Sequence, residues 1–123
     1  MKEEFGLFIK KKREQKYISL RNFSKMIGIS PVYLSNIENG ERPAPKNDIL
    51  MRIINALLLD EKEKETMWDL AAQTKKNPCI AYDLTEYLIY NANVYRILRL
   101  AKRCDASDED WEVFEDYLSQ KYL

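Results

Sequence analysis

Histidine is absent from this sequence of 123 residues, and cysteine, glycine and proline are scarce, with two, three and four copies. Histidine is the commonest general base and metal ligand, so its absence counts against acid–base catalysis and most metal sites. Two cysteines cannot complete a zinc site without other ligands. The phosphate-binding loop, the dinucleotide-binding motif and the nucleophile elbow are also missing. We therefore expect no enzyme, with no catalytic residue, no metal and no cofactor.

Long apolar runs are lacking as well. A membrane-spanning helix needs about 20 consecutive apolar residues, and no stretch of this chain approaches that length. The cysteines, Cys79 and Cys104, are too few and too widely spaced to indicate a disulfide framework. We therefore expect a cytoplasmic protein with no membrane partner.

Net charge is zero, because 20 Lys/Arg balance 20 Asp/Glu, but the charges are unevenly distributed. Residues 1–52 contain eleven Lys/Arg and six Asp/Glu, a balance of +5. Residues 53–123 contain nine Lys/Arg and fourteen Asp/Glu, a balance of −5. Because attraction to phosphate depends on the local surface, the basic half is sufficient for docking on nucleic acid.

The most informative segment is SLRNFSKMIGISPVYLSNIENGER, residues 19–42. Gly28 ends its first helix and Gly40 follows its second, where helices commonly change to left-handed geometry. Between them, Ser30 is a good N-cap and Pro31 suits the first helical position. Apolar residues recur on one side of each helix: Leu20, Phe23 and Ile27, then Leu34 and Ile37. Helices so closely linked must cross steeply, the geometry that presents a second helix to a DNA major groove.

Apolar periodicity outside this segment predicts three more helices in the first part of the chain. They cover residues 3 or 4 to 15, residues 47–57 and a stretch after Asp60, whose side chain would form a capping box with Glu63. With the two helices of the central segment they make up a predicted domain of residues 1–74.

The pattern is interrupted at Asn77-Pro78, and we expect a hinge at residues 75–82. The remaining extension, residues 83–123, contains three predicted helices, the second capped by Asn93. These helices cover residues 84–90, 94–103 and 108–121. About 40 residues are too few to bury a core unaided, so the extension must pack on the first domain or on another copy of itself.

Tyrosine is abundant in this C-terminal part. Aromatic residues are enriched in protein interfaces, but helical spacing favours a place in the core for most of these side chains. They are Tyr82, Tyr87, Tyr90, Tyr95, Tyr117 and Tyr122.

The run GISPVYLSNIENGERPAP resembles the Cro/repressor-type (XRE family) helix-turn-helix proteins of bacteria, phages and mobile elements. The resemblance spans about residues 5–57, and its most specific part is the pattern Y-L-S-x-I-E-x-G-x-R-x-P. It implies an all-α fold, with a five-helix lambda-repressor-like helix-turn-helix domain whose third helix enters the major groove of a DNA operator. Here a small helical C-terminal extension would follow that domain.

The resemblance also assigns roles by position. Residues aligned with the family's base-reading positions are Pro31, Val32, Tyr33 and Asn36. We expect DNA backbone contacts from Ser19, Arg21, Ser30, Ser35, Arg42 and Lys46. Arg13 and Glu38 align with a structural ion pair between the first and third helices. Asn36 is suited to adenine and Val32 to a thymine methyl group.

A cationic cluster ends the first predicted helix. It consists of Lys10, Lys11, Lys12, Arg13 and Lys16. The cluster is either a solvated surface whose charge favours the helix C-terminus, or one or two of its lysines contact phosphate.

The sequence thus predicts a sequence-specific DNA-binding transcriptional regulator, and we expect a repressor. Helix-turn-helix proteins usually bind paired half-sites, which favours a homodimer. The alternative is an antitoxin-like or adaptor protein whose main role is to bind a protein partner, such as a toxin, through the C-terminal helices.

Overall fold

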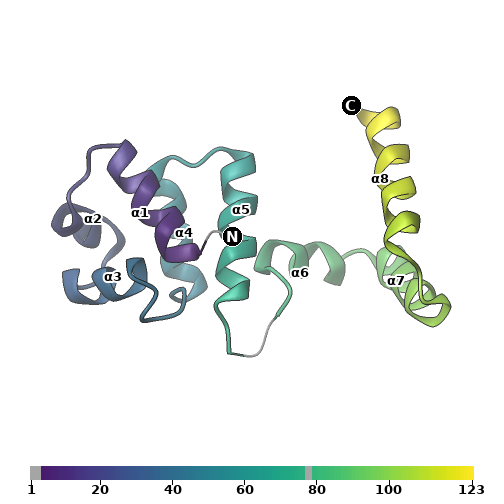
Figure 1. The fold of residues 1–123 in the computed structure, drawn as a ribbon, viewed down its shortest axis with the longest axis horizontal. Helices are drawn as coiled ribbons and strands as arrows, with labels where there is room; N and C mark the ends of the chain where they lie inside the picture. Colours follow the sequence, from purple (N-terminus) through teal and green to yellow (C-terminus); the bar gives the residue numbers. More distant parts are fainter. Residues whose placement is uncertain (1–3, 77–78) are drawn as a thin grey trace. The chain divides into compact units, whose positions relative to one another are not determined.

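The computed structural model describes residues 4–76 and 79–123, and the regular structure of these residues is entirely α-helical (Figure 1). The predicted all-α class is therefore confirmed. The helices are α1 (Phe5–Gln15), α2 (Leu20–Ile27), α3 (Pro31–Glu38), α4 (Asn47–Leu57), α5 (Glu61–Gln73), α6 (Tyr82–Ile89), α7 (Ala92–Cys104) and α8 (Asp108–Tyr122). Part of the predicted hinge, residues 77–78, lies outside the described residues. None of the described helices combines the length and apolar character needed to cross a bilayer.

The chain divides into two compact units, Met1–Thr85 (unit 1) and Glu86–Leu123 (unit 2). The division falls inside α6, a few residues after the segment predicted as a hinge. In unit 1, Ala81 is buried and the ring of Tyr82 lies 5.5 Å from that of Trp68. The beginning of α6 therefore belongs to the first unit.

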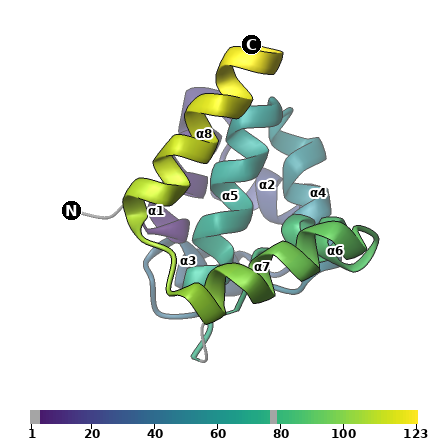
Figure 2. The same ribbon diagram turned by 90° about the vertical axis from the view of Figure 1, so that its right-hand side faces the viewer.

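Unit 1 is built around one hydrophobic core. In it, α1 packs against α3 and α5, and α2 packs against α3 and α4 (Figures 1 and 2). The largest fully buried apolar side chains are Phe5, Phe23, Ile9, Ile27, Leu34, Ile37, Leu50, Ile53, Leu57 and Met67. Burying a Leu, Ile or Phe side chain stabilises a fold by about 1.5–3 kcal/mol. Because this core includes the inner side of α3, it fixes which side of that helix faces solvent.

The helix ends in unit 1 follow the local sequence signals. The Oγ atom of Ser19 accepts the backbone N–H of Asn22 at 3.1 Å, which caps α2, and Asp60 and Glu63 form the predicted capping box of α5. Gly28 and Gly40 adopt left-handed geometry, with φ of 76° and 80°. These predicted helix ends are confirmed.

A close approach between α1 and α3 was not predicted. A Cβ atom built on Gly6 would lie 2.2 Å from the carbonyl oxygen of Ile37 and 2.7 Å from that of Glu38. Both neighbours are backbone atoms, so they cannot rotate away. Gly6 therefore allows α1 to lie directly on the C-terminal end of α3.

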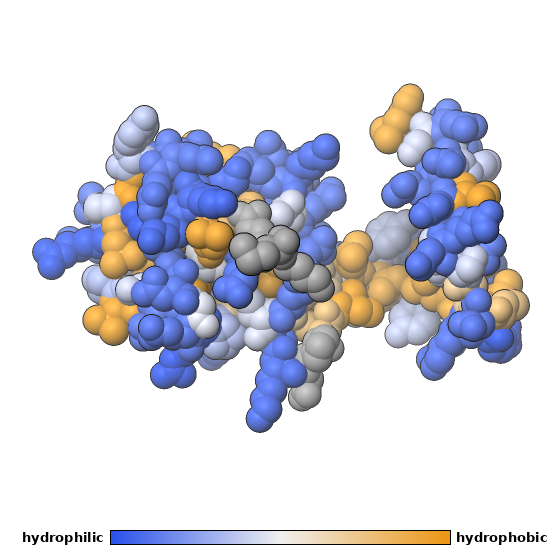
Figure 3. All heavy atoms as spheres, viewed as in Figure 1, coloured by the Kyte–Doolittle hydropathy of each residue, from blue (hydrophilic) through white to orange (hydrophobic). Residues whose placement is uncertain are grey.

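Unit 2, all of whose residues are described, buries none of its side chains. The prediction that most tyrosines of the extension lie in the core is wrong. Their exposed fractions run from 42% for Tyr82, which lies in unit 1, to 83% for Tyr90 in unit 2. Figure 3 shows apolar residues at the surface of the molecule. Helical spacing predicted the side of each helix on which these rings lie, but unit 2 buries none of its own tyrosines.

The predicted cap of α7 is also wrong. The helix begins at Ala92, so Asn93 lies within its first turn. Asn91 occupies the N-cap position, but its side chain makes no capping hydrogen bond. Its Nδ2 atom instead donates to the carbonyl oxygen of Tyr87, in the last turn of α6, at 2.6 Å.

Candidate nucleic-acid interface

The two sides of α3 have opposite characters. Leu34 and Ile37 are fully buried in the core of unit 1, whereas Val32 is 71% and Tyr33 37% exposed. Asn36 lies at the boundary and is half-buried. The predicted base-reading side chains therefore lie on or beside the solvent-facing side of a helix whose other side is fixed.

An open depression of about 480 Å³ lies on this side of α3. Its lining residues are Ser30, Val32, Tyr33, Asn36, Arg42 and Pro43. Pro31, the fourth predicted base-reading residue, is exposed but does not line it. The depression's aliphatic group, from Val32, suits a thymine methyl group, and its carboxamide, from Asn36, suits adenine. The phenol of Tyr33 suits polar base edges. The guanidinium of Arg42 suits phosphate or guanine.

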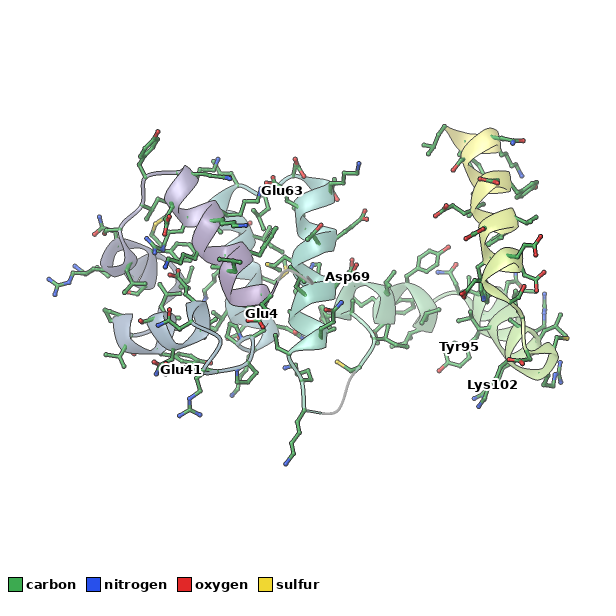
Figure 4. All side chains as sticks on the ribbon, in the orientation of Figure 1. Glu4, Glu41, Glu63, Asp69, Tyr95 and Lys102 are labelled. Atoms are coloured by element: carbon green, nitrogen blue, oxygen red, sulfur yellow. The ribbon has the colours of Figure 1, made fainter. Side chains whose placement is uncertain are left out.

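Arg42 is held close to α3 by the backbone. The carbonyl oxygen of Asn36 accepts the backbone N–H groups of Glu41 at 2.9 Å and Arg42 at 3.2 Å. The positive φ of Gly40 makes this reversal possible. Figure 4 shows the turn, with Glu41 labelled. The guanidinium of Arg42 therefore extends from a defined backbone turn beside α3.

The loop that carries Arg42 and Lys46 is anchored on α5. Thr74 Oγ1 accepts the backbone N–H of Ala44 at 2.9 Å and donates to the carbonyl oxygen of Ala71 at 2.7 Å. Ala44 is buried, as is Pro45. Lys46 is exposed at the N-cap position of α4 and makes no capping hydrogen bond with its side chain. Two cations are thus presented by a loop that the core holds in place.

Serine residues cap both helices of the central segment. The Oγ atom of Ser30 accepts the backbone N–H of Tyr33 at 3.1 Å, as Ser19 does for α2. A serine hydroxyl that accepts a capping bond retains its own O–H for donation, for example to a phosphate oxygen. Arg21 is exposed on the first turn of α2, and Ser35 is half-buried on α3. These residues are compatible with the backbone contacts expected of them.

Arg13 and Glu38 form a buried, bidentate ion pair between α1 and α3. The Nε atom of Arg13 lies 2.8 Å from Oε2 of Glu38, and its Nη2 atom lies 3.0 Å from Oε1. Its Nη1 atom donates to the carbonyl oxygen of Ile18 at 2.8 Å. The hydrogen bond to Glu38 is the main cause that raises the pKa of Arg13. All three nitrogens of this guanidinium therefore make hydrogen bonds within unit 1, which assigns Arg13 to the fold.

One lysine of the cationic cluster is also paired within unit 1. The Nζ atom of Lys12 lies 2.5 Å from Oε2 of Glu63, whose other oxygen closes the capping box of α5 (Figure 4, where Glu63 is labelled). The backbone N–H of Asp60 and then Lys12 lower the pKa of Glu63. Lys12 therefore links α1 to α5.

Comparisons with known proteins agree with this geometry. A family model described as helix-turn-helix matches residues 9–63. The immF control region 10 kDa protein of Bacillus phage phi105 is 40% identical over 58 residues, which are 47% of this chain and 63% of the phage protein. Residues 9–63 are therefore similar to helix-turn-helix domains over just under half of the chain.

Two further relatives have the same percentage identity to this chain. They are uncharacterised helix-turn-helix-type transcriptional regulators from two strains of Mycobacterium tuberculosis, each 40% identical over 52 residues, or 42% of this chain and 36% of the regulator. The matched region spans less than two thirds of each relative. Among solved structures, the SinR protein/SinI protein complex covers 95% of this chain and 96% of the matched chain, with a TM-score of 0.49 and 21% identity. That likeness is too distant to support an argument.

Besides Gly6, three residues of unit 1 with notable geometry were not predicted from the sequence. Thr74 anchors the loop, as described above. The Nη1 atom of Arg52 donates to the carbonyl oxygen of Ile27 at 3.3 Å, at the end of α2. Tyr17 has a φ of 56° and is 97% exposed. Thr74 and Arg52 contact residues 30 and 25 positions away in the sequence, so no local pattern reveals them. Tyrosine carries no local signal for left-handed geometry.

Proposed function

We propose that this chain is a sequence-specific regulator of transcription that binds double-stranded DNA and inserts α3 into the major groove. The observation that carries the proposal is the exposed side of α3, where Val32, Tyr33 and Asn36 line one depression together with Arg42. A rigid helix that presents a few polar and aliphatic groups beside a cation has the geometry for base reading next to a phosphate.

In this proposal the contacts divide into two groups. Asn36 pairs with adenine, Tyr33 contacts a base edge or phosphate, and Val32 and Pro31 make apolar contacts with bases. The phosphates are bound by Ser19, Arg21, Ser30, Ser35, Arg42 and Lys46. Because only two of the base-reading side chains have strong hydrogen-bonding groups, DNA shape supplies part of the specificity.

We also propose the finer architecture that this function requires. Helices α1 to α5 form a five-helix lambda-repressor-like domain, and α6 to α8 form its extension. The protein acts without catalysis, in the cytoplasm, as a homodimer on an operator with two half-sites. We propose a repressor, because a dimer seated across an operator obstructs access to the DNA beneath it.

A second function is favoured by one observation, the absence of buried side chains in unit 2. An antitoxin-like or adaptor protein would offer such a surface to another protein, for example a toxin. In that case binding of DNA would be secondary, and the exposed apolar residues of unit 2 would bind the partner.

Selection of bound DNA from a random pool by the full chain tests the proposal. We expect enrichment of an inverted repeat whose half-sites are about 10–10.5 base pairs apart or a multiple of that spacing. A single enriched half-site would retain DNA reading and reject the homodimer. Absence of any enriched sequence would reject sequence-specific binding and favour the protein-partner function.

A further inference from the structure

Unit 2 is too small and too exposed to be complete as it stands. It has 38 residues, Glu86–Leu123, and domains below about 40 residues usually need a disulfide, a metal or association with another surface. Its sequence contains one cysteine, Cys104, and no histidine, so it holds no internal disulfide. Association is the remaining means of stabilisation.

Both long helices of unit 2 present an apolar stripe that nothing in the unit covers. On α7, Val94, Ile97, Leu98 and Ala101 follow the i, i+3, i+4, i+7 pattern of one helix side. Ile97 is 49% and Leu98 40% exposed. Amphipathic helices of this kind normally bury such a stripe against another element.

The apolar stripe of α8 is rich in aromatic side chains and borders a groove. An open groove of about 410 Å³ is lined by Trp111, Phe114, Glu115, Leu118, Ser119, Tyr122 and Leu123. Trp111 is 40% and Phe114 49% exposed. Large aromatic side chains in a groove are the usual anchors of protein interfaces.

The two helices carry opposite charges. The charged residues of α7 are all cations, Arg96, Arg99, Lys102 and Arg103. Those of α8 are six carboxylates, Asp108, Glu109, Asp110, Glu112, Glu115 and Asp116, and one cation, Lys121. The ammonium of Lys121 lies over the rings of Tyr117 and Tyr122 at 5.6 and 5.2 Å. The chain therefore contains both members of a complementary helix pair.

We propose that unit 2 is completed by a second copy of this chain, with the apolar stripe of α7 in one copy packed against the aromatic groove of α8 in the other. A two-fold axis repeats each such contact, so α7 also receives α8 in the reverse sense. Lys102, which borders the α7 stripe beside Leu98, then faces the carboxylates of the α8 groove, Glu115 among them. This inference rests on the homodimer of the proposed function and names its surface and its pairing.

Complementarity within one chain is what favours a second copy over an unrelated partner. A partner of one charge would suit only one of the two helices and would be repelled by the other. A second copy satisfies both at once. It also places two α3 helices on one particle, as paired half-sites require.

Charge reversal on one helix at a time tests the pairing in the full chain. The α7-acidic variant carries Lys102→Glu, and the α8-basic variant carries Glu115→Lys. Lys102 follows Leu98 by four residues, and Glu115 lines the α8 groove, so both borders are altered. We expect the dimer dissociation constant of each variant, measured by light scattering over a concentration series, to rise by roughly tenfold or more.

An equimolar mixture of the two variants is the decisive sample. One variant then has a carboxylate at both substituted positions, 102 and 115, and the other has a cation at both, so each intermolecular pair of these positions regains opposite charges. We expect a particle of twice the 14.6 kDa of one chain, at close to wild-type affinity. Repulsion within each chain persists on mixing, so recovery reports contacts between copies only.

Matched controls place the same charge changes on the opposite sides of the helices. They are Arg103→Glu on α7 and Asp116→Lys on α8. We expect less than roughly a threefold change in the dissociation constant. Circular dichroism of each variant checks that helix content is kept.

Three results would overturn the proposal: a wild-type chain that is monomeric at micromolar concentration, test variants that dimerise as tightly as the controls, or a mixture that stays monomeric. A monomer would mean that the stripes are covered in another way, by unit 1 or by a different protein. None of these samples contains DNA, so the proposed DNA binding can succeed or fail independently.

Discussion

Unit 1 and unit 2 contain amphipathic helices of the same kind, but only those of unit 1 enclose a core. Every buried hydrophobic residue of the described chain lies in unit 1. There, α1 meets α3 and α5, and α2 meets α3 and α4, so each apolar side is covered. In unit 2, the stripes of α7 and α8 remain exposed. The difference shows that an apolar pattern predicts a helix and its inner side, but not what covers that side.

The unfolding of unit 1 can be followed separately because each unit contains one tryptophan. Trp68 is 6% exposed in unit 1, and Trp111 is 40% exposed in unit 2. A Trp111→Phe background therefore reports unfolding of unit 1 alone, through the fluorescence of Trp68. Variants that alter the stability of unit 1 are compared in that background.

The largest effect is expected from Glu38→Gln. It leaves the buried guanidinium of Arg13 without its counter-charge, and breaking a buried ion pair in this way is strongly destabilising. We expect the free energy of unfolding of unit 1 in urea to fall by about 3 kcal/mol. Glu41→Gln, an exposed neighbour, should change it by less than about 0.5 kcal/mol. Equal losses of stability for the two variants would show that the Arg13–Glu38 ion pair does not stabilise unit 1.

The next effect is expected from Gly6→Ala. The added methyl group meets backbone carbonyl oxygens of α3 that cannot rotate away, so α1 and α3 must separate. We expect a loss of about 2 kcal/mol in the same urea titration. Leu7→Ala, on the exposed side of the same turn, is the control and should cost less. A stable Gly6→Ala variant would contradict the close approach of the two helices.

Asn36→Ala separates base reading from folding. We expect affinity for the selected DNA site to fall by about 2 kcal/mol, and base preference at the contacted position to relax. Because Asn36 is half-buried and its backbone oxygen holds the turn before Arg42, unfolding of unit 1 is measured in parallel. Loss of affinity without loss of base preference would reject its role as a base-reading residue.

Arg42→Ala tests the phosphate-binding side of the same depression. We expect affinity to fall by about 1 kcal/mol for all DNA sequences alike, and the slope of log affinity against log salt to flatten by about one unit. Fluorescence anisotropy over a salt series gives both quantities. If Arg42→Ala relaxed base preference and Asn36→Ala flattened the salt dependence, the two assigned roles would be interchanged.

The smallest effect is expected from Tyr17→Gly, and it has the opposite sign. Tyr17 holds left-handed geometry, which glycine adopts without steric cost. We expect unit 1 to gain about 0.5 kcal/mol in free energy of unfolding. Tyr17→Ala retains the Cβ atom and should give no such gain. A loss of stability on Tyr17→Gly would mean that the ring contributes to the fold despite its exposure.

The sequence predicted those parts of the fold that local chemistry determines. Ser19 and Asp60 cap helices through atoms three residues away, so their roles are visible in a short window. Gly6 and Thr74 act on residues about 30 positions distant, and no periodicity reveals such a neighbour. For the tyrosines of the C-terminal part, the expected core was wrong because burial depends on a covering surface, which spacing alone does not supply.

The candidate site was predicted to a similar degree. The resemblance placed Val32, Tyr33 and Asn36 on the outer part of one helix, and the structure brings them together with Arg42 in one depression. The anchoring of the loop on α5, which fixes Arg42, had no sequence signal because it joins Ala44 to Thr74. The DNA contacts themselves remain predictions.

Amide hydrogen exchange at two protein concentrations, well below and well above the dimer dissociation constant, tests the difference between the units most directly. Unit 1 has its own core, so its protection should be independent of concentration. Unit 2 should gain protection in α7 and α8 at the higher concentration, because association stabilises it by mass action. Equal protection of α7 and α8 at both concentrations would contradict the account, since unit 2 would then be complete within one chain.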